Sequence, residues 1–373
     1  MTGDNTMKDK LGLLLADKGF RGAIIFSEGT CSILAPSYLH YFSGVRPLGA
    51  RNSAVVTKEG AVCLLVDPPW DAGRMAAKSW ITDVRGATSF TDDLIGIVAE
   101  YGLSHSPVAL IGSREMSETI YEKLSAKVKI EAADSLFESM AKGKSPRELG
   151  SVYRAARIAD IGYEAFTDAA RPGMKETELV AEVEFAMRAA GAQDIFILIS
   201  SGLHNYEMHE PTDRRLRKGD IIIGEITPVV EGQFIQLCRT VVLGAPPPVV
   251  ADRYLMLRHA LDESLAQIKP GVESGAVSRA MNRVISEAGY GSYCYPPYMR
   301  ARAHGFGVGS IAPGGAIDDD TKTPFERLQT VVVHPNQYLP ETGYLACGET
   351  VLVGTTGAQR LAATETKLYV KEV

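Results

Sequence analysis

A sharp helix start at residues 145–148 divides the chain into two parts. These residues read Ser-Pro-Arg-Glu, a capping box with proline at the first helical position. Apolar residues then recur at helical spacing until Arg-Pro-Gly at 171–173, which predicts a long amphipathic helix. Residues 140–144 are polar and glycine-containing, and we interpret them as a linker. A chain of 373 residues is long enough for two domains, which we expect at 1–140 and 145–373.

The first part of the chain alternates between helical and extended patterns. Two apolar runs flank Lys-Glu-Gly at 58–60, which predicts a hairpin. Alternation of this kind is typical of an α/β domain. The predicted elements are helices over residues 8–18 and 115–124, and strands over 22–26, 53–56, 61–66 and 108–111.

The second part groups its helices around strands that are expected to pair antiparallel, which indicates an α+β domain. A second amphipathic helix begins near Thr177, after the one that starts at residue 145. The remaining predicted elements are a helix over residues 253–268 and strands over 195–199, 221–226, 234–243 and 330–334.

Composition excludes several classes of partner. The chain is 45% hydrophobic and 23% charged, as in ordinary soluble globular proteins, and its net charge of −6 argues against nucleic acid. No apolar run approaches the roughly 18–20 residues that span a bilayer, and the N-terminus does not read as a signal peptide. The odd number of scattered cysteines fits a reduced, cytoplasmic setting.

Five segments of the second part carry motifs in a characteristic order. They are HEPT at 209–212, the run KGDIIIGEITPVVEGQFIQLCRTVVLG at 218–244, HGFG at 304–307, VVVHPN at 331–336 and GETV at 348–351. Their order and spacing resemble the creatinase/aminopeptidase P/prolidase family. The resemblance implies an α+β chain in which a pita-bread domain follows an α/β creatinase-type N-terminal domain.

The resemblance also locates the five positions at which the family normally carries metal ligands. The family order is Asp, Asp, His, Glu, Glu, whereas this chain has Glu225, Gln236, His304, His334 and Gly348. An amide and a hydrogen atom replace two bridging carboxylates, so little negative charge remains for a pair of divalent cations. We therefore expect a divergent member with no metal and no cofactor.

Three residues are the catalytic candidates. Neutral imidazole takes and returns a proton near pH 7, and creatinase-like enzymes use the residue matching His209 as acid/base, which His304 would assist. Glu225 lies in an apolar strand, where an unpaired carboxylate is costly. We favour a site acid there over a locally paired strand-edge acid. Ectoine hydrolases also keep a glutamate near this position.

Other side chains are candidates for binding a small polar substrate. Gln236 and Cys238 share one face of their strand because side chains alternate. The Gln236 amide can orient a substrate, whereas Cys238 is either core filling or a nucleophile. His334 is expected to point inward.

Residues 41–51, YFSGVRPLGAR, match a segment that reaches across a dimer in creatinase-like relatives. The resemblance therefore implies a homodimer. Arg46 and Arg51 could each clamp a substrate carboxylate in bidentate fashion, or simply be exposed loop charges.

Three functional hypotheses follow. The favoured one is a metal-independent, creatinase-like hydrolase or lyase that cleaves a C–N bond of a small polar substrate, which can bear a carboxylate, by histidine acid/base catalysis. The second is an enzyme in which Glu225, His304 and His334 hold a single Zn²⁺ or Fe²⁺. The third is a non-catalytic binding protein on a retired peptidase scaffold. Classical Xaa-Pro cleavage needs metal-activated water and is not expected.

Overall fold

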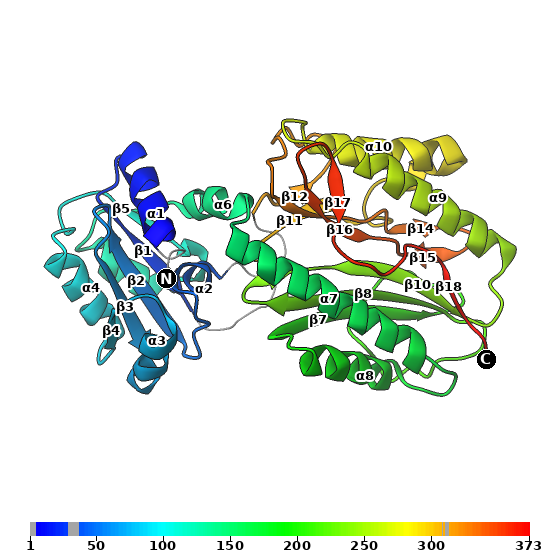
Figure 1. Cartoon of the computed structure of the whole chain (residues 1–373), viewed down its shortest axis with the longest axis horizontal. Helices are drawn as coiled ribbons and strands as arrows, with labels where there is room; N and C mark the ends of the chain where they lie inside the picture. The colour runs from blue at the N-terminus through cyan, green and yellow to red at the C-terminus, as the bar shows by residue number, and fades with distance from the viewer. Residues whose placement is uncertain (1–4, 29–36, 308, 310–312) are drawn as a thin grey trace. The chain divides into compact units, whose positions relative to one another are not determined.

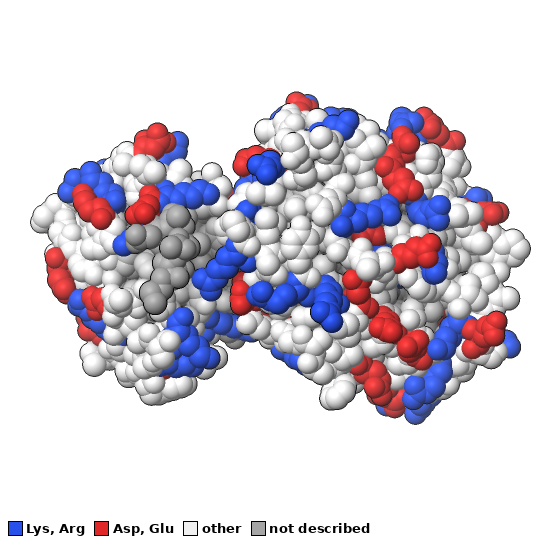
Figure 2. Space-filling model, in the orientation of Figure 1, with Lys and Arg blue, Asp and Glu red and all other residues white. Residues whose placement is uncertain are grey.

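The computed structural model describes residues 5–28, 37–307, 309 and 313–373. The chain divides into two compact units, Met1–Ala141 and Lys142–Val373 (Figure 1). On the face drawn in Figure 2, basic and acidic side chains lie interspersed over the surface of each unit. Within the described residues, every helix is too short or too polar to cross a membrane.

The first unit is a six-stranded sheet in the order β4-β3-β2-β1-β5-β6. Strand β2 runs antiparallel to both of its neighbours, and the other neighbouring pairs are parallel. The strands are β1 (Gly22–Ser27), β2 (Arg51–Thr57), β3 (Val62–Asp67), β4 (Asp83–Gly86), β5 (Val108–Ile111) and β6 (Ile130–Ala132). The helices are α1 (Asn5–Asp17), α2 (Tyr38–Ser43), α3 (Ala72–Lys78), α4 (Phe90–Glu100), α5 (Glu118–Ser125) and α6 (Asp134–Lys142).

Two predictions for this unit need correction. The predicted linker at 140–144 is partly helical, because α6 continues to Lys142 and buries Met140 and Ala141. The helix predicted over 115–124 starts later, at Glu118, after a short 3₁₀ turn. The predicted hairpin is present as β2 and β3, with Gly60 in the left-handed region at φ 91°.

The second unit contains two main sheets. The first has the order β18-β10-β8-β7, with β9 paired to β8, and the second has the order β12-β11-β13-β16-β17. The first sheet comprises β7 (Asp194–Gly202), β8 (Ile221–Val230), β9 (Gln233–Phe234), β10 (Leu237–Leu243) and β18 (Tyr369–Lys371). The second comprises β11 (Ala303–Phe306), β12 (Ala316–Ile317), β13 (Thr330–Val333), β16 (Glu349–Val353) and β17 (Ala358–Arg360). A separate hairpin joins β14 (Gln337–Leu339) to β15 (Gly343–Leu345).

Two pairs of helices cover these sheets (Figure 1). They are α7 (Pro146–Ala169) with α8 (Glu176–Ala189), and α9 (Pro248–Leu265) with α10 (Gly275–Ile285). The first pair shares a buried apolar core with β7, β8 and β10, and the second pair shares another with β13 and β16. A backbone bridge between Cys238 and Gly348 joins the two sheets. The inner residues of both sheets therefore meet in one region.

The capping box of α7 is confirmed. The Ser145 side chain accepts from the Glu148 N–H, and the Glu148 carboxylate accepts from the Ser145 N–H at 2.9 Å. Such a cap typically contributes about 1 kcal/mol. In contrast, the single strand predicted over 234–243 is broken into β9 and β10. At the break, the Gln236 N–H donates to Thr350 Oγ1 at 2.9 Å instead of to a neighbouring strand.

Candidate functional site

The centre of the candidate site is a buried carboxyl–thiol pair. Glu225 on β8 stands directly opposite Cys238 on β10, and opposed residues of an antiparallel pair project from the same face. Cys238 Sγ lies 3.5 Å from Glu225 Oε2, and both side chains are buried. Tyr163 and Phe166 of α7 pack against the opposite face of β8, next to Gly224. The apolar strand is thus closed by helices on one face and carries these polar groups on the other.

Two side-chain amides complete the surroundings of the thiol. Gln236 Nε2 lies 3.8 Å and Asn336 Nδ2 lies 3.6 Å from Cys238 Sγ. Burial, followed by the nearby Glu225 charge, raises the pKa of Cys238 well above its ordinary value. Because the thiolate is the nucleophilic form, this environment weighs against Cys238 as a nucleophile.

Burial also raises the pKa of Glu225, although the positive charge of Arg300 and the hydrogen bond from Cys238 oppose the shift. Burial disfavours the ionised carboxylate. The site therefore shifts Glu225 toward its protonated form relative to a solvated carboxyl group, and in this structure Glu225 Oε2 accepts from the Cys238 thiol.

Two histidines meet on neighbouring inner strands of the second sheet. His304 lies on β11, and His334 follows β13 and donates its N–H to the Arg302 carbonyl at 2.9 Å. Their ring centroids are 5.4 Å apart. Burial, with a smaller contribution from His304, lowers the pKa of His334 to about 3, so its imidazole is neutral at pH 7. Its Nδ1 is buried and has no hydrogen-bond partner among the described residues.

Gly348 stands at the last of the five motif positions, and its neighbours leave no room for a side chain. A β-carbon at Gly348 would lie 2.7 Å from His334 Cβ and 3.1 Å from Cys238 Cβ. Real β-carbons essentially never approach other atoms to less than 3.0 Å. His334 and Cys238 therefore occupy the space that a carboxylate side chain at position 348 would need.

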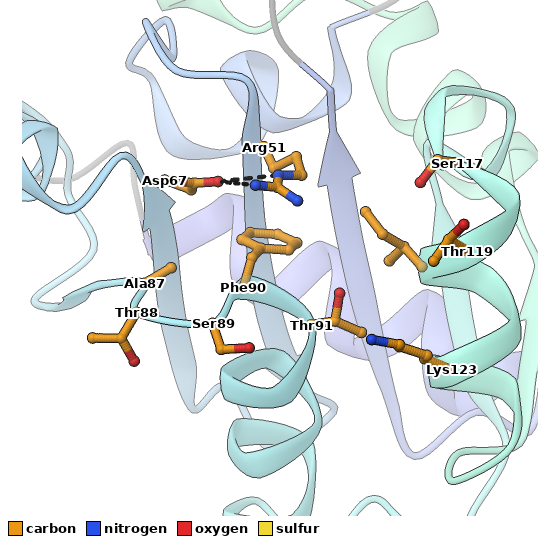
Figure 3. A pocket seen from close by; sticks show the side chains of 11 residues that line it. Arg51, Asp67, Ala87, Thr88, Ser89, Phe90, Thr91, Ser117, Thr119 and Lys123 are labelled. Atoms are coloured by element: carbon orange, nitrogen blue, oxygen red, sulfur yellow. Dashed lines mark hydrogen bonds and ion pairs between the residues drawn. The ribbon is translucent and has the colours of Figure 1, made fainter.

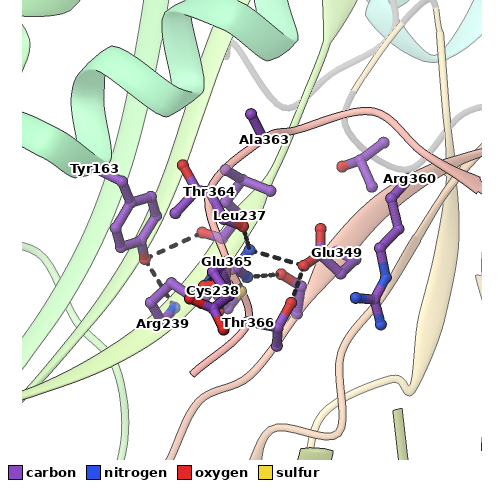
Figure 4. A network of polar contacts seen from close by, with 12 residues as sticks. Tyr163, Leu237, Cys238, Arg239, Glu349, Arg360, Ala363, Thr364, Glu365 and Thr366 are labelled. Carbon is purple, nitrogen blue, oxygen red and sulfur yellow. Dashed lines mark hydrogen bonds and ion pairs between the residues drawn. The ribbon is translucent and has the colours of Figure 1, made fainter. Parts of the chain in front are cut away.

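A buried ion pair lies on the face of β10 opposite to Cys238 and supports the backbone next to Gly348 (Figure 4). Arg239 donates to Glu349 at 2.7 Å and to the Gly348 carbonyl at 2.5 Å, and both charged side chains are almost fully buried. The Arg239 N–H also donates to the Tyr163 hydroxyl at 2.8 Å. In the sequence, Arg239 lies within the motif run at 218–244 and was not among the candidate residues. Its partner follows Gly348 directly, so the pair holds the backbone on which the site is built.

His209 lies beside the cluster of buried polar side chains around Cys238 rather than within it. Its neighbour Met208 packs with Cys238 and Tyr344. His209 itself exchanges two backbone hydrogen bonds with Ile199, whose side chain packs on the helix-covered face. The His209 Nδ1 lies 2.6 Å from the Glu210 carbonyl oxygen.

Arg46 and Arg51 belong to the first unit. Arg51 pairs with Asp67 through two contacts of 3.0 and 2.8 Å, and its guanidinium lies over the Phe90 ring. Both partners line a pocket of about 370 Å³ between the start of α4 and the start of α5 (Figure 3). Arg46 is half-buried, and its carbonyl accepts a hydrogen bond from Arg74. A role for either arginine across a dimer remains a prediction.

Three residues at this site were not among the sequence candidates. Asn336 contacts the thiol, Tyr344 packs beside it, and the charge of Arg300 acts on Glu225. Only Asn336 carried a local signal, because it lies two residues after His334 in the motif VVVHPN. Tyr344 lies on β15 of the separate hairpin and Arg300 on the loop before β11, and the sequence pattern defined neither segment.

The donor set does not fit the metals that the motif positions suggest. The five positions supply one carboxyl, one amide and two imidazoles, which lack the bridging charge of a two-metal centre. Within the described ranges, no three His, Cys, Asp or Glu side chains lie close enough together to hold an ion. Glu225, His304 and His334 do not form such a group in the described part of the chain, and the single-metal hypothesis for them stays a prediction.

Comparison with known proteins places this geometry in context. The sequence model described as metallopeptidase family M24 matches residues 151–355, more than half of the chain. The Xaa-Pro dipeptidase of Pyrococcus furiosus is 25% identical over 344 residues, which cover 90% of this chain and 94% of that protein.

Solved structures show the same fold. The prolidase from Pyrococcus horikoshii OT3 has a TM-score of 0.85 at 23% identity, covering 98% of this chain and all of that one. The X-Pro aminopeptidase from Thermotoga maritima has a TM-score of 0.86 at 21% identity, covering 97% and 99%. The predicted fold class, a pita-bread domain preceded by an α/β domain, is confirmed.

Proposed function

Because the chain belongs to metallopeptidase family M24, as its motifs predicted, we propose that it is a hydrolase that cleaves a C–N bond in a small polar substrate without bound metal. The observation that carries this proposal is the filled space at Gly348, where the β-carbon of His334 leaves no room for a carboxylate ligand. The Cys238 thiol and the His334 imidazole, both neutral at pH 7, pack beside this position.

The proposed chemistry is a proton transfer between neutral groups. Hydrolysis adds OH to carbon and H to nitrogen. An imidazole, His304 in the cluster or His209 beside it, accepts a proton from the attacking water. Protonated Glu225 donates a proton to the departing nitrogen, and the two groups then exchange the proton through solvent to restore the starting state. The raised pKa of Glu225 supports its role as the acid.

The amides have a positioning role in this proposal. Gln236 and Asn336 both direct an NH₂ group toward Cys238 Sγ. A polar substrate that enters this region meets donors already oriented by buried contacts, since Asn336 Oδ1 accepts from the Cys347 N–H at 3.1 Å. Preoriented donors stabilise developing charge without reorganisation.

The test is activity in the absence of metal. Protein treated with chelator and shown to be metal-free by elemental analysis is assayed against a panel of small N-acyl and N-carbamoyl compounds. We expect cleavage that added chelator does not reduce, and a loss of at least about 100-fold in His304→Gln. His259→Gln, at an exposed position on α9, is the matched control and should retain full activity. Cleavage that appears only with a divalent cation would overturn the proposal.

A second candidate is metal-dependent cleavage of Xaa-Pro dipeptides. The similarity to the Pyrococcus furiosus protein of that name over nine-tenths of the chain favours it. Glycyl-proline assayed with and without Mn²⁺, Co²⁺ or Zn²⁺ separates the two candidates. Metal-stimulated cleavage would establish the second candidate and defeat the first.

The homodimer, the cytoplasmic location and the non-catalytic alternative stay predictions. Light scattering of the purified chain measures the first directly. Absence of turnover across both substrate panels, with retained ligand binding, would favour the binding protein.

A further inference from the structure

The described part of the first unit contains a pocket of about 370 Å³ that the proposed function does not use (Figure 3). Its lining residues come from the sheet edge where β3 and β4 end and the antiparallel strand β2 begins, and from the starts of α4 and α5. Ligands of open α/β sheets bind outside the carboxyl ends of the parallel strands. Small-molecule sites typically have volumes of about 300–1,000 Å³. The pocket therefore has the position and the size of a ligand site.

The side of the pocket formed by α5 carries hydrogen-bond donors without partners in the protein. Lys123 extends from α5 toward Thr91 at the start of α4 (Figure 3), and it forms no hydrogen bond or ion pair with any residue that the structure describes. Thr91, Ser117 and Thr119 line the same pocket, and their hydroxyl groups likewise have no hydrogen bond to a described residue. An ammonium group has three donors and each hydroxyl has one. This side therefore offers a ligand several donors and a positive charge.

Arg51 contributes a second cation that is held in place by two neighbours. Its Nε and Nη2 lie 3.0 and 2.8 Å from Asp67 Oδ2, and its Cζ lies 5.7 Å from the centroid of the Phe90 ring. A guanidinium carries five N–H donors, so about three remain for a ligand. Asp67 supplies the one carboxylate among the lining residues. The two cations therefore leave the lining with a net positive charge.

Carboxylates at the start of α4 bind groups of their own segment. Asp93 Oδ2 accepts the N–H groups of Thr88 and Ser89 at 2.7 and 2.9 Å, and Asp92 Oδ2 accepts the Ser89 hydroxyl at 2.7 Å. Neither of these carboxylates lines the pocket, and the acidic residues of α5 do not line it either. The donors at the start of α4 are thus already satisfied, so an anion is favoured on the α5 side, next to Lys123.

A phosphate group matches this set of donors. It presents three terminal oxygens and close to two negative charges at neutral pH, so an ammonium, hydroxyls and a guanidinium can bind it together. A carboxylate has only two oxygens and one charge. The volume also leaves room for a small organic group beside the phosphate, next to the buried side chains of Ala87, Phe90 and Ile120.

We propose that the pocket between the starts of α4 and α5 binds a small phosphomonoester. Lys123, the hydroxyls of Thr91, Ser117 and Thr119, and Arg51 hold its phosphate group. This site lies wholly in the first unit and is additional to the candidate site of the second unit. It gives Arg51 a different role from the substrate clamp that the sequence predicted. The inference goes beyond the proposed function and does not depend on it.

The experiment measures binding to the full-length protein by isothermal titration calorimetry. Three probes share a glycerol-like body: glycerol 3-phosphate carries a phosphate, glycerate carries a carboxylate, and glycerol is uncharged. We expect glycerol 3-phosphate to bind at least about 10-fold more tightly than glycerate, and glycerol not to bind measurably. Glycerate binding as tight as that of glycerol 3-phosphate, or no binding of glycerol 3-phosphate at about 10 mM, would overturn the inference. Inorganic phosphate should bind several-fold more weakly, and equal binding would reject the organic part of the ligand.

Substitutions at exposed positions of α5 test the assigned contacts without placing the fold at risk. Lys123→Gln should weaken glycerol 3-phosphate binding at least about 10-fold, because it removes a charge-assisted contact. Thr119→Val should weaken it about 3- to 10-fold, whereas Thr119→Ser keeps the hydroxyl and should retain the affinity. Lys127→Gln, at an exposed position outside the pocket, is the matched control and should bind as the wild type does. Unchanged affinity in Lys123→Gln, or an equal loss in Lys127→Gln, would overturn the inference.

Discussion

His334 occupies the space beside Gly348, with its β-carbon 2.7 Å from the position that a β-carbon on Gly348 would take. The two positions are 14 residues apart in the chain and are brought together where β13 and β16 pair. A side chain at either motif position therefore restricts the other. The contact involves the β-carbon of residue 334, which every residue except glycine carries, so it reflects how closely the two backbones approach.

This relationship predicts that Gly348→Ala is destabilising. The added methyl group would crowd His334 and Cys238, and overpacking of this kind costs about 1–3 kcal/mol. The double variant His334→Gly/Gly348→Ala should be less destabilised than the sum of its two single variants. Urea unfolding of the four proteins measures the coupling. Gly150→Ala on α7, where the nearest atom would be 3.8 Å away, is the control. If the effects of His334→Gly and Gly348→Ala on the free energy of unfolding simply add, the proposed crowding between the two positions is contradicted.

The buried His334 also predicts a pH dependence of stability. Its folded-state pKa is about 3, below the ordinary value of 6.5, so the unfolded chain binds a proton that the folded chain rejects. This stability is fully present above pH 6.5 and is lost as the pH falls toward 3. Between pH 7 and pH 5 the free energy of unfolding should fall by about 2 kcal/mol through this residue alone.

The measurement is urea unfolding of the wild type and His334→Gln at both pH values. The wild type should lose about 2 kcal/mol more than the variant, whereas replacing exposed His259 should leave the difference unchanged. Equal losses in the wild type and His334→Gln would show that His334 is not held in its neutral form.

Local signals in the sequence were sufficient for part of this structure. The capping box at Ser145 is complete within four residues, so helix α7 could be predicted from the sequence alone. The break in the strand at Gln236 could not, because its cause is a hydrogen bond to Thr350, which lies 114 residues away. Gln236 thus reaches the site from a short irregular segment and not from the continuous strand that alternation predicted.

The candidate site shows the same limit. The motifs identified Glu225 beside Cys238, and His334 beside Gly348, because family motifs record residues that meet in space. They could not show that Arg51 is already paired with Asp67, or that Arg300 approaches the cluster through a loop. Pairing and loop course depend on contacts between segments far apart in the sequence.

Labelling can distinguish the two interpretations of Cys238, as a core-filling side chain or as a nucleophile. Its raised pKa and complete burial predict that iodoacetamide at pH 7.5 labels the partly exposed Cys294 well before Cys238. Mass spectrometry of the tryptic peptides gives the two rates. Cys238→Ala should keep activity within about 10-fold, since its role is contact and not attack, whereas loss of a nucleophile typically costs far more. Preferential labelling of Cys238, together with inactivation, would restore the nucleophile hypothesis.

The Arg239–Glu349 pair should be the more costly of two ion pairs to break. Both of its side chains are almost fully buried, and Thr366 also donates to Glu349. Glu349→Ala leaves a buried guanidinium without its counter-charge, which typically costs about 3–5 kcal/mol. The exposed pair Arg283–Glu263, with N and O atoms 2.9 Å apart, is the control, and Glu263→Ala should cost less than about 1 kcal/mol.

Because Arg239 also holds the Gly348 carbonyl, Glu349→Ala should lower activity even at temperatures where the protein stays folded. Unfolding curves and assays of the same samples measure both effects. A loss in stability no larger than that of Glu263→Ala would show that the buried pair does not stabilise the backbone of the site.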